Sequence, residues 1–189
     1  MYLNRKLLFF VIFFSFVAIP QKKITLDQVF KGEFSGEYFA PVKWTESGHT
    51  YYKIEDGDDG SQIFKIDVTT GEKTLVVSTK DLIPEGKSDP LNLKDYKLSP
   101  SGKWILIYTN TKKVWRVNSR GDYWVYNTET KKLRKLGGSD AKPSTLQFAK
   151  LDPTENFVAY VRENNLYLEN LTTGEIKALT KDGSRTIIN

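Results

Sequence analysis

The chain contains no cysteine and only one histidine, His49. Without a thiol it can form neither a disulfide nor a cysteine-ligated zinc site, and it cannot use a cysteine nucleophile. A single histidine also excludes metal centres that need several histidines, including the two-histidine motif of zinc proteases. Because His49 follows Ser47–Gly48, a pair typical of turns, we expect it in a turn at the surface.

The familiar catalytic and cofactor motifs are absent as well. No glycine-rich phosphate loop occurs, and Gly32–Gly36 (GEFSG) has its serine one place too late for a G-x-S-x-G elbow. The acidic run Glu55–Gly60 (EDGDDG) resembles a calcium loop but lacks the distal bidentate glutamate. Asp-Gly pairs favour turns, so a hairpin turn is the stronger interpretation and a calcium site the weaker one. We therefore expect no catalytic residue, no cofactor and no metal in this chain.

The charge is modestly positive and mixed in sign. The 28 lysines and arginines face 23 acidic residues, giving a net charge of +5. The densest positive run, Lys131–Lys135, follows a predicted strand and turn. A nucleic-acid surface is the less favoured alternative, because no nucleic-acid-binding motif surrounds the run. We expect a solvated strand end there and no nucleic-acid partner.

Only one long apolar run is present, Leu7–Ile19, and it follows the basic stretch Asn4–Lys6. It is shorter than the roughly 17 to 25 residues that span a bilayer, and it has the length and flanks of a secretory signal. Residues 1–20 are therefore predicted to be a signal peptide. An uncleaved N-terminal anchor is the alternative, since Ala18–Pro20 is a poor cleavage site. Export to the periplasm, cell envelope or exterior of a bacterium follows as an expectation.

After this segment, Thr25–Phe30 (TLDQVF) predicts a short helix, with Thr25 as N-cap and Gln28 completing a capping box. From Trp44 onward the sequence shows almost no helical periodicity. A repeated unit follows instead, beginning WTESGHTYYKI at Trp44, LSPSGKWILIY at Leu98 and LDPTENFVAYV at Leu151. Each copy continues into a second strand and a polar turn.

A four-stranded unit recurring every 40 to 50 residues or so is typical of β-propeller blades. The predicted fold class is therefore all-β: an incomplete propeller of about three blades, preceded by the signal segment and the short helix. Propellers usually need about four to eight blades to close, so we expect exposed strand edges and blade faces.

One predicted hairpin is unusually long. Its strands are Trp104–Tyr108 and Tyr123–Tyr126, and roughly a dozen residues intervene where two to five are usual. Trp115 and Arg116 stand in the middle of this segment.

Three segments resemble dipeptidyl peptidase IV-type enzymes of the prolyl oligopeptidase family of serine peptidases: Ile24–Tyr52, Tyr96–Asn127 and Asn164–Asn189. The resemblance covers essentially residues 24–189. In that family an eight-bladed propeller covers an α/β-hydrolase domain, and the enzyme removes N-terminal dipeptides with proline or alanine second. The resemblance implies that residues 24–189 are the N-terminal part of such a propeller, truncated at Asn189.

The resemblance also assigns roles. By position, Arg116 is similar to the family's arginine that points into the cavity and holds the substrate's carbonyl or carboxylate, with Trp115 packed beside it as support. The alternative is that Arg116 is an ordinary surface arginine, in which case Arg120 is an equal candidate for a salt bridge. The family's paired glutamates and its serine, aspartate and histidine lie beyond Asn189, so this chain would contribute substrate binding and gating but no catalysis.

The expected partner is a peptide substrate of the full-length parent, which is expected to be a serine-type dipeptidyl peptidase and could form a homodimer. Membrane contact is expected only through an uncleaved leader. The alternative function is a non-catalytic envelope propeller module that pairs with a partner chain.

Overall fold

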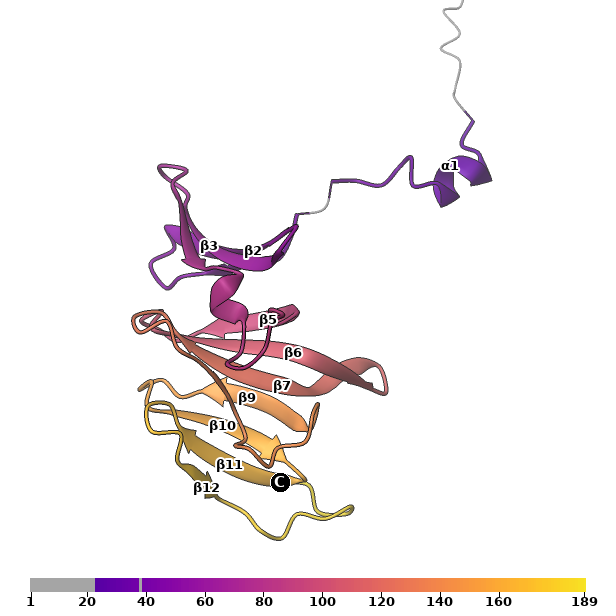
Figure 1. Ribbon diagram of the computed structural model, residues 1–189. Helices are drawn as coiled ribbons and strands as arrows, with labels where there is room; N and C mark the ends of the chain where they lie inside the picture. Colours follow the sequence, from indigo (N-terminus) through magenta and orange to yellow (C-terminus); the bar gives the residue numbers. More distant parts are fainter. Residues whose placement is uncertain (1–22, 38) are drawn as a thin grey trace, which may run out of the picture. The chain divides into compact units, whose positions relative to one another are not determined.

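A computed structural model describes residues 23–37 and 39–189 (Figure 1). The predicted signal peptide, residues 1–20, lies outside the described residues. The chain divides into two compact units, Met1–Phe39 and Ala40–Asn189. Within the described residues, no helix has the length and apolar character needed to cross a membrane.

The first unit contains the helix α1, Leu26–Phe30. Thr25 caps it: its hydroxyl accepts from the Gln28 backbone N–H at 3.3 Å, and the Gln28 side chain accepts from the Thr25 N–H at 3.0 Å. These reciprocal bonds satisfy two donors that a helix start leaves unpaired. The predicted capping box is confirmed.

The second unit consists of three antiparallel four-stranded blades, which confirms the predicted all-β class. The first blade is formed by β1 (Val42–Trp44), β2 (Thr50–Gly57), β3 (Gly60–Asp67) and β4 (Lys73–Val77). The second, which follows the short 3-10 helix η1 (Lys80–Leu82), is formed by β5 (Leu93–Leu98), β6 (Trp104–Val114), β7 (Val117–Asn127) and β8 (Leu133–Lys135). The third is formed by β9 (Leu146–Leu151), β10 (Phe157–Arg162), β11 (Asn165–Asn170) and β12 (Ile176–Ala178).

The polar turn that ends the third strand of each blade has one construction. In all three, an Asp or Asn oxygen accepts from the backbone N–H groups two and three residues later, at 2.8 to 3.1 Å. The acceptors are Asp67, Asn127 and Asn170. The residue four places after each acceptor has a positive φ, which favours glycine or a strained substitute. These residues are Gly71, Lys131 and Gly174. The repeat inferred from sequence is therefore also a repeat of hydrogen bonds.

The core is made between blades rather than within them, because a single sheet cannot bury both of its faces. One buried cluster joins the first two blades and includes Ile63, Tyr96 and Ile107. The other joins the second and third and includes Leu146 and Tyr160. Figure 1 shows the three blades as successive layers.

The second and third blades are also joined by backbone pairing. Arg120 and Gly121 of β7 pair with Gln147 and Leu146 of β9, so the two blades form one eight-stranded sheet. No such pairing joins the first blade, whose four strands form a separate sheet.

The hairpin is long, as predicted, but most of the residues between the two predicted strands form paired strand rather than a loop. The strands β6 and β7 continue toward each other until Val114 pairs with Val117, leaving a two-residue turn of Trp115 and Arg116. Two register irregularities between Thr109 and Lys113 absorb the uneven lengths, as β-bulges do. The extension was missed because its lysine, asparagine, serine and glycine residues have low strand propensity, whereas cross-strand pairing decides the structure.

Candidate functional site

Arg116 lies at the turn of this two-stranded extension, which we call the ribbon: Thr109–Val114 of β6, the turn, and Val117–Asp122 of β7. The ribbon projects beyond the rest of the second blade (Figure 1). Arg116 is exposed, and its guanidinium carbon lies 5.9 Å from the centre of the Trp115 ring. Trp115 itself is 92% exposed and has φ +63°. The Trp115 ring therefore lies beside Arg116 without being buried against the rest of the blade, and its supporting role stays a prediction.

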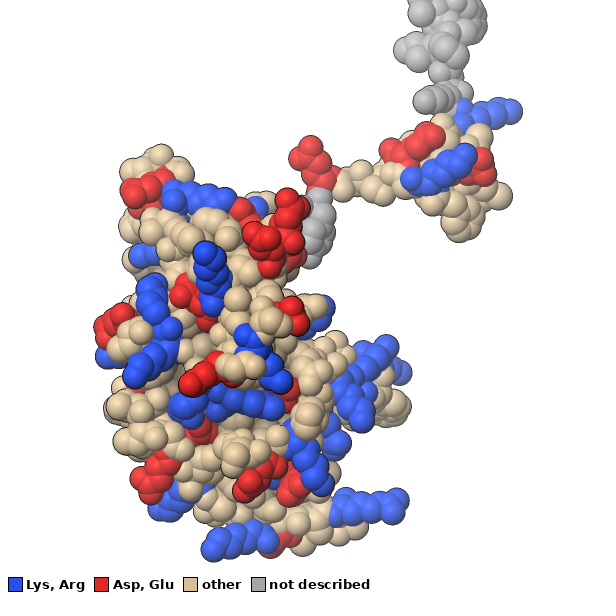
Figure 2. All heavy atoms as spheres, viewed as in Figure 1, with Lys and Arg blue, Asp and Glu red and all other residues tan. Residues whose placement is uncertain are grey.

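The ribbon is strongly basic. Four exposed cations lie on it: Lys112, Lys113, Arg116 and Arg120. Figure 2 shows Lys and Arg side chains gathered on the projecting ribbon. None of the ion pairs among residues 23–37 and 39–189 involves them. An exposed group of cations attracts anionic and carbonyl-rich ligands, and an arginine can donate two parallel hydrogen bonds to an oxygen pair.

The base of the ribbon is much less exposed to solvent than its tip. Thr109, Gly121 and Asp122 are buried, whereas Val114 through Asn118 are exposed. The structure therefore presents Arg116 at the end of an exposed ribbon whose root is embedded between two blades.

The other sequence candidates lie elsewhere. His49 is exposed in the turn between β1 and β2, as predicted, and its carbonyl accepts from the Val68 N–H at 3.0 Å. The acidic run turns between β2 and β3 at Asp58 and Asp59, also as predicted. In the described part of the chain, no group of three or more His, Asp or Glu side chains is arranged to hold a metal ion.

The basic run Lys131–Lys135 is not simply a solvated strand end, and that expectation is corrected. Arg134 bonds to the buried Glu169 of the third blade, and Lys135 lies 3.4 Å from the Asp122 carboxylate. Sequence reasoning missed both acidic partners because neither lies near the basic run in the chain.

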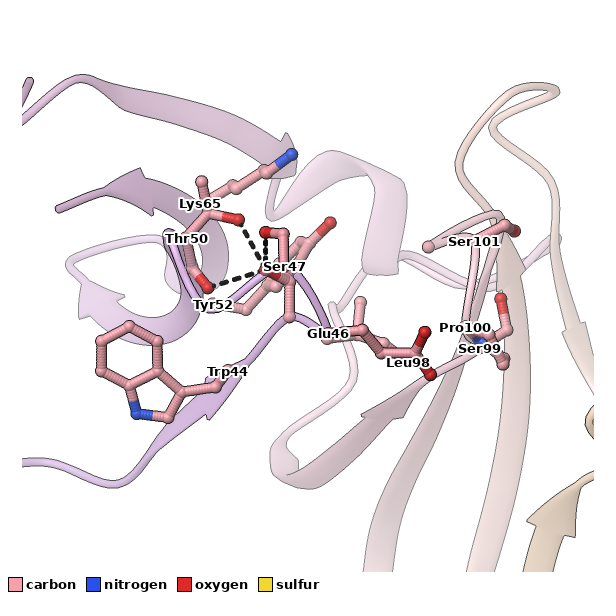
Figure 3. A pocket seen from close by; sticks show the side chains of 12 residues that line it. Trp44, Glu46, Ser47, Thr50, Tyr52, Lys65, Leu98, Ser99, Pro100 and Ser101 are labelled. Carbon is pink, nitrogen blue, oxygen red and sulfur yellow. Dashed lines mark hydrogen bonds between the residues drawn. The ribbon is translucent and has the colours of Figure 1, made fainter. Parts of the chain in front are cut away.

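A cavity of about 430 Å³ opens between the first two blades, where the β1–β2 and β5–β6 turns face each other (Figure 3). Polar and apolar groups share its lining about equally, and Glu46, Ser47 and Ser101 are among the polar residues. Gly102 also lines it, and a Cβ there would meet the Tyr52 hydroxyl at 3.2 Å. Arg116 is not among the lining residues, so this cavity and the ribbon are separate features.

The corresponding gap between the second and third blades is bridged. Glu155 occupies the place in the β9–β10 turn that Gly102 has in the β5–β6 turn, and it also has a positive φ, +61° against +78° for Gly102. Its carboxylate accepts from the Ser101 N–H and hydroxyl, both at 2.6 Å. The sequence signal that could have pointed to the contact is a glutamate at a turn position where the second copy of the repeat has glycine.

Comparisons with known proteins agree with this geometry. The family model described as "Dipeptidyl peptidase IV (DPP IV) N-terminal region" matches residues 99–189. Probable dipeptidyl-aminopeptidase B of Arthroderma benhamiae is 32% identical over 182 residues, covering 88% of this chain and 19% of that protein. The protein of the same name from Trichophyton verrucosum is 30% identical over 184 residues, with the same coverages.

Among solved structures, the crystal structure of Porphyromonas gingivalis dipeptidyl peptidase 4 aligns with a TM-score of 0.69 at 20% identity. The alignment covers 86% of this chain and 22% of that one, and it supports the propeller fold. The chain spans about a fifth of the length of the relatives it matches. Together, these similarities support a dipeptidyl peptidase IV-type N-terminal propeller fragment.

Proposed function

We propose that this chain forms substrate-contacting blades of a serine-type dipeptidyl peptidase, in which Arg116 binds a carbonyl or carboxylate oxygen of the peptide. The observation that carries the proposal is the position of Arg116 at the turn of a ribbon that projects from the second blade. The names of the similar proteins denote dipeptidyl peptidases, which supports release of N-terminal dipeptides as the reaction. The preference for proline or alanine in the second position is proposed from the family resemblance alone.

The chemistry of the side chain suits this role. A guanidinium is charged at every physiological pH, and its planar fork matches an oxygen pair, whereas a lysine ammonium acts as a point charge. Lys112 and Lys113 add positive potential along the same ribbon. A peptide approaching the ribbon would therefore meet a cationic field first and the Arg116 fork at its end.

Within the proposal, the chain contributes substrate binding and gating but no catalytic residue. Acyl transfer by a serine peptidase requires a nucleophile, a base and an orienting acid, which the proposal places outside these blades. The chain alone is therefore expected not to hydrolyse a Gly-Pro chromogenic substrate. We further propose that the protein acts after export, directed by residues 1–20, and that the parent is able to form a homodimer.

The proposal is tested by Arg116→Ala in a full-length peptidase that contains these blades. A charge-assisted hydrogen bond is worth about 1.5–3 kcal/mol, so kcat/KM should fall roughly ten- to a hundredfold. Arg116→Lys should recover only part of the loss. Arg120→Ala is the matched control, since it removes a second exposed cation from the same ribbon. Wild-type kcat/KM in a folded Arg116→Ala enzyme would contradict the proposal.

A second candidate function is a non-catalytic binding module that pairs its open blade face with a partner chain. The observation that favours it is the exposed apolar surface of the first blade, where Trp44 and Leu75 are 57% and 47% exposed. If this candidate is correct, the chain associates with a partner chain, and Arg116→Ala leaves peptide hydrolysis unchanged.

A further inference from the structure

The β6–β7 ribbon is fixed at its base, and three independent contacts determine the direction in which it leaves the blade. The base contains a bulge, because the register shifts between Thr109 and Lys112 and Asn110 has φ +46°. A bulge bends and twists the strand that carries it. Whatever stabilises this bulge therefore sets the path of the ribbon and of Arg116 at its end.

The first contact is a ring of hydrogen bonds around Asp122, a buried residue of β7. Its Oδ2 accepts from the Asn110 side-chain amide at 2.8 Å, and its Oδ1 accepts from the Ser144 backbone N–H at 2.9 Å. Ser144 closes the ring by donating its hydroxyl to the Asn110 carbonyl at 2.6 Å. Because Ser144 precedes β9, the ring ties the bulge to the third blade.

The second contact is made by Tyr108. Its ring lies directly against Gly121, since a Cβ at that position would come within 2.3 Å of the ring and 2.9 Å of the Thr109 carbonyl. The Tyr108 hydroxyl donates to the Arg120 carbonyl at 2.8 Å, and the Asn118 carbonyl lies 3.1 Å from the same hydroxyl. A side chain of β6 thus fixes the backbone of β7 beyond the bulge.

The third contact is the pairing of Arg120 and Gly121 with β9, which gives the root of the ribbon a partner in the neighbouring blade. An isolated two-stranded ribbon is only marginally stable in water. With its base anchored on both sides, this ribbon can present its turn in one direction, which preorganises the binding group.

We propose that Asp122 and Tyr108 are positioning residues that aim Arg116, the first by fixing the bulge and the second by fixing the opposite strand. This inference rests on the proposed function of Arg116 for its effect on substrate, but its structural part can be measured without any activity. Neither residue is expected to touch the peptide.

The structural part is tested by double electron–electron resonance on the complete chain, with labelled chain diluted in unlabelled chain so that distances within one copy are measured. Because the sequence has no cysteine, Val117→Cys and Lys150→Cys carry the only two spin labels, one on the ribbon and one on β9. We expect a narrow distance distribution in the otherwise unchanged chain and a clearly broader one in Tyr108→Phe and Asp122→Ala. Asp122→Asn should be intermediate, since an amide oxygen can still accept from the Ser144 N–H.

Two control variants separate positioning from general loss of stability. Tyr123→Phe removes the hydroxyl of the ring stacked on Tyr108, at 4.6 Å between centres. Asp81→Asn alters a carboxylate that accepts from the N–H and hydroxyl of Ser78, away from the ribbon. Both should keep the narrow distribution. If Asp122→Ala fails to fold, Tyr108→Phe decides the outcome, and a folded Tyr108→Phe chain with an unchanged distribution would overturn the inference.

The effect on substrate is measured in the full-length peptidase. Loss of one hydrogen bond that orders the ribbon should raise KM about two- to tenfold in Tyr108→Phe with little change in kcat. If Arg116→Ala lowers kcat/KM but Tyr108→Phe leaves KM unchanged, the positioning role is overturned and the proposed function of Arg116 stands. If Arg116→Ala has no effect, the proposed function fails, while the spin-label distances still decide whether the base aims the ribbon.

Discussion

Glu169 of β11 places a fully buried carboxylate against the guanidinium of Arg134 in β8, so an ion pair joins the second and third blades. The same carboxylate accepts from the Gly137 N–H at 2.9 Å and from the Tyr160 hydroxyl at 3.0 Å. The other terminal nitrogen of Arg134 lies 3.2 Å from each of the carbonyls of Asn170 and Leu171. Burial and the neighbouring Glu169 charge raise the pKa of Tyr160, which keeps its hydroxyl a donor.

Arg134→Ala is expected to destabilise the chain by about 3 kcal/mol, because it leaves Glu169 charged and buried without its cation. Chemical denaturation followed by tryptophan fluorescence measures the change. Lys177→Ala, which removes an exposed lysine at the equivalent place in β12, is the control and should change stability by no more than about 0.5 kcal/mol. Equal effects of the two substitutions would mean that the ion pair does not stabilise the contact between the blades.

The bond between Glu155 and Ser101 should make stability depend on pH. Burial raises the pKa of Glu155, but the hydrogen bonds from the Ser101 hydroxyl and N–H outweigh it, so the pKa lies below its ordinary value of 4.5. A carboxyl with a lowered folded-state pKa stabilises above the unfolded value, and this stabilisation is lost as pH falls through the folded value.

Glu155→Gln should therefore lower the Tm at pH 7 but lose its effect as the pH falls below about 4. Thermal unfolding at a series of pH values gives the comparison. Glu163→Gln is a suitable control, since Glu163 also has a positive φ but lies at the β10–β11 turn. A Tm difference for Glu155→Gln that is the same at pH 3 and pH 7 would contradict the assignment.

The chain is expected to self-associate through the open face of the first blade. The strand register places Trp44 and Leu75 on the same face, and both are exposed. Exposed apolar faces and strand edges recruit other chains. Sedimentation velocity should show oligomers that diminish in a Trp44→Ser, Leu75→Ser variant. Replacing Ile24, an exposed residue outside the blades, by serine should change little, and a monomeric, cooperatively melting wild-type chain would refute this expectation.

The N-terminal segment is expected to direct export, from its basic start and apolar run alone. Met1–Lys23 fused to a reporter that is active only outside the cytoplasm should give activity. Replacing Phe13 and Phe14, in the centre of the run, by aspartate should abolish it. Retention of the unaltered fusion in the cytoplasm would rule out the predicted signal.

The blades can be predicted from local sequence patterns. Strand alternation and turn residues are local properties, so the recurrence at Trp44, Leu98 and Leu151 was enough to predict three four-stranded units. The capping box of α1 was predictable for the same reason, because Thr25 and Gln28 are three residues apart. The position of Arg116 in the middle of a long hairpin was also visible without a structure.

How that arginine is presented, and how the blades are joined, depends on contacts between residues far apart in the chain. The ribbon's polar residues carry little strand propensity, and their pairing becomes favourable only when Tyr108 packs on Gly121 and Asp122 bonds to Asn110 and Ser144. The partners in such contacts are far apart in the chain, as Arg134 and Glu169 are. Local patterns contain no information on which distant donor will meet which buried acceptor, since burial itself creates the requirement for a partner.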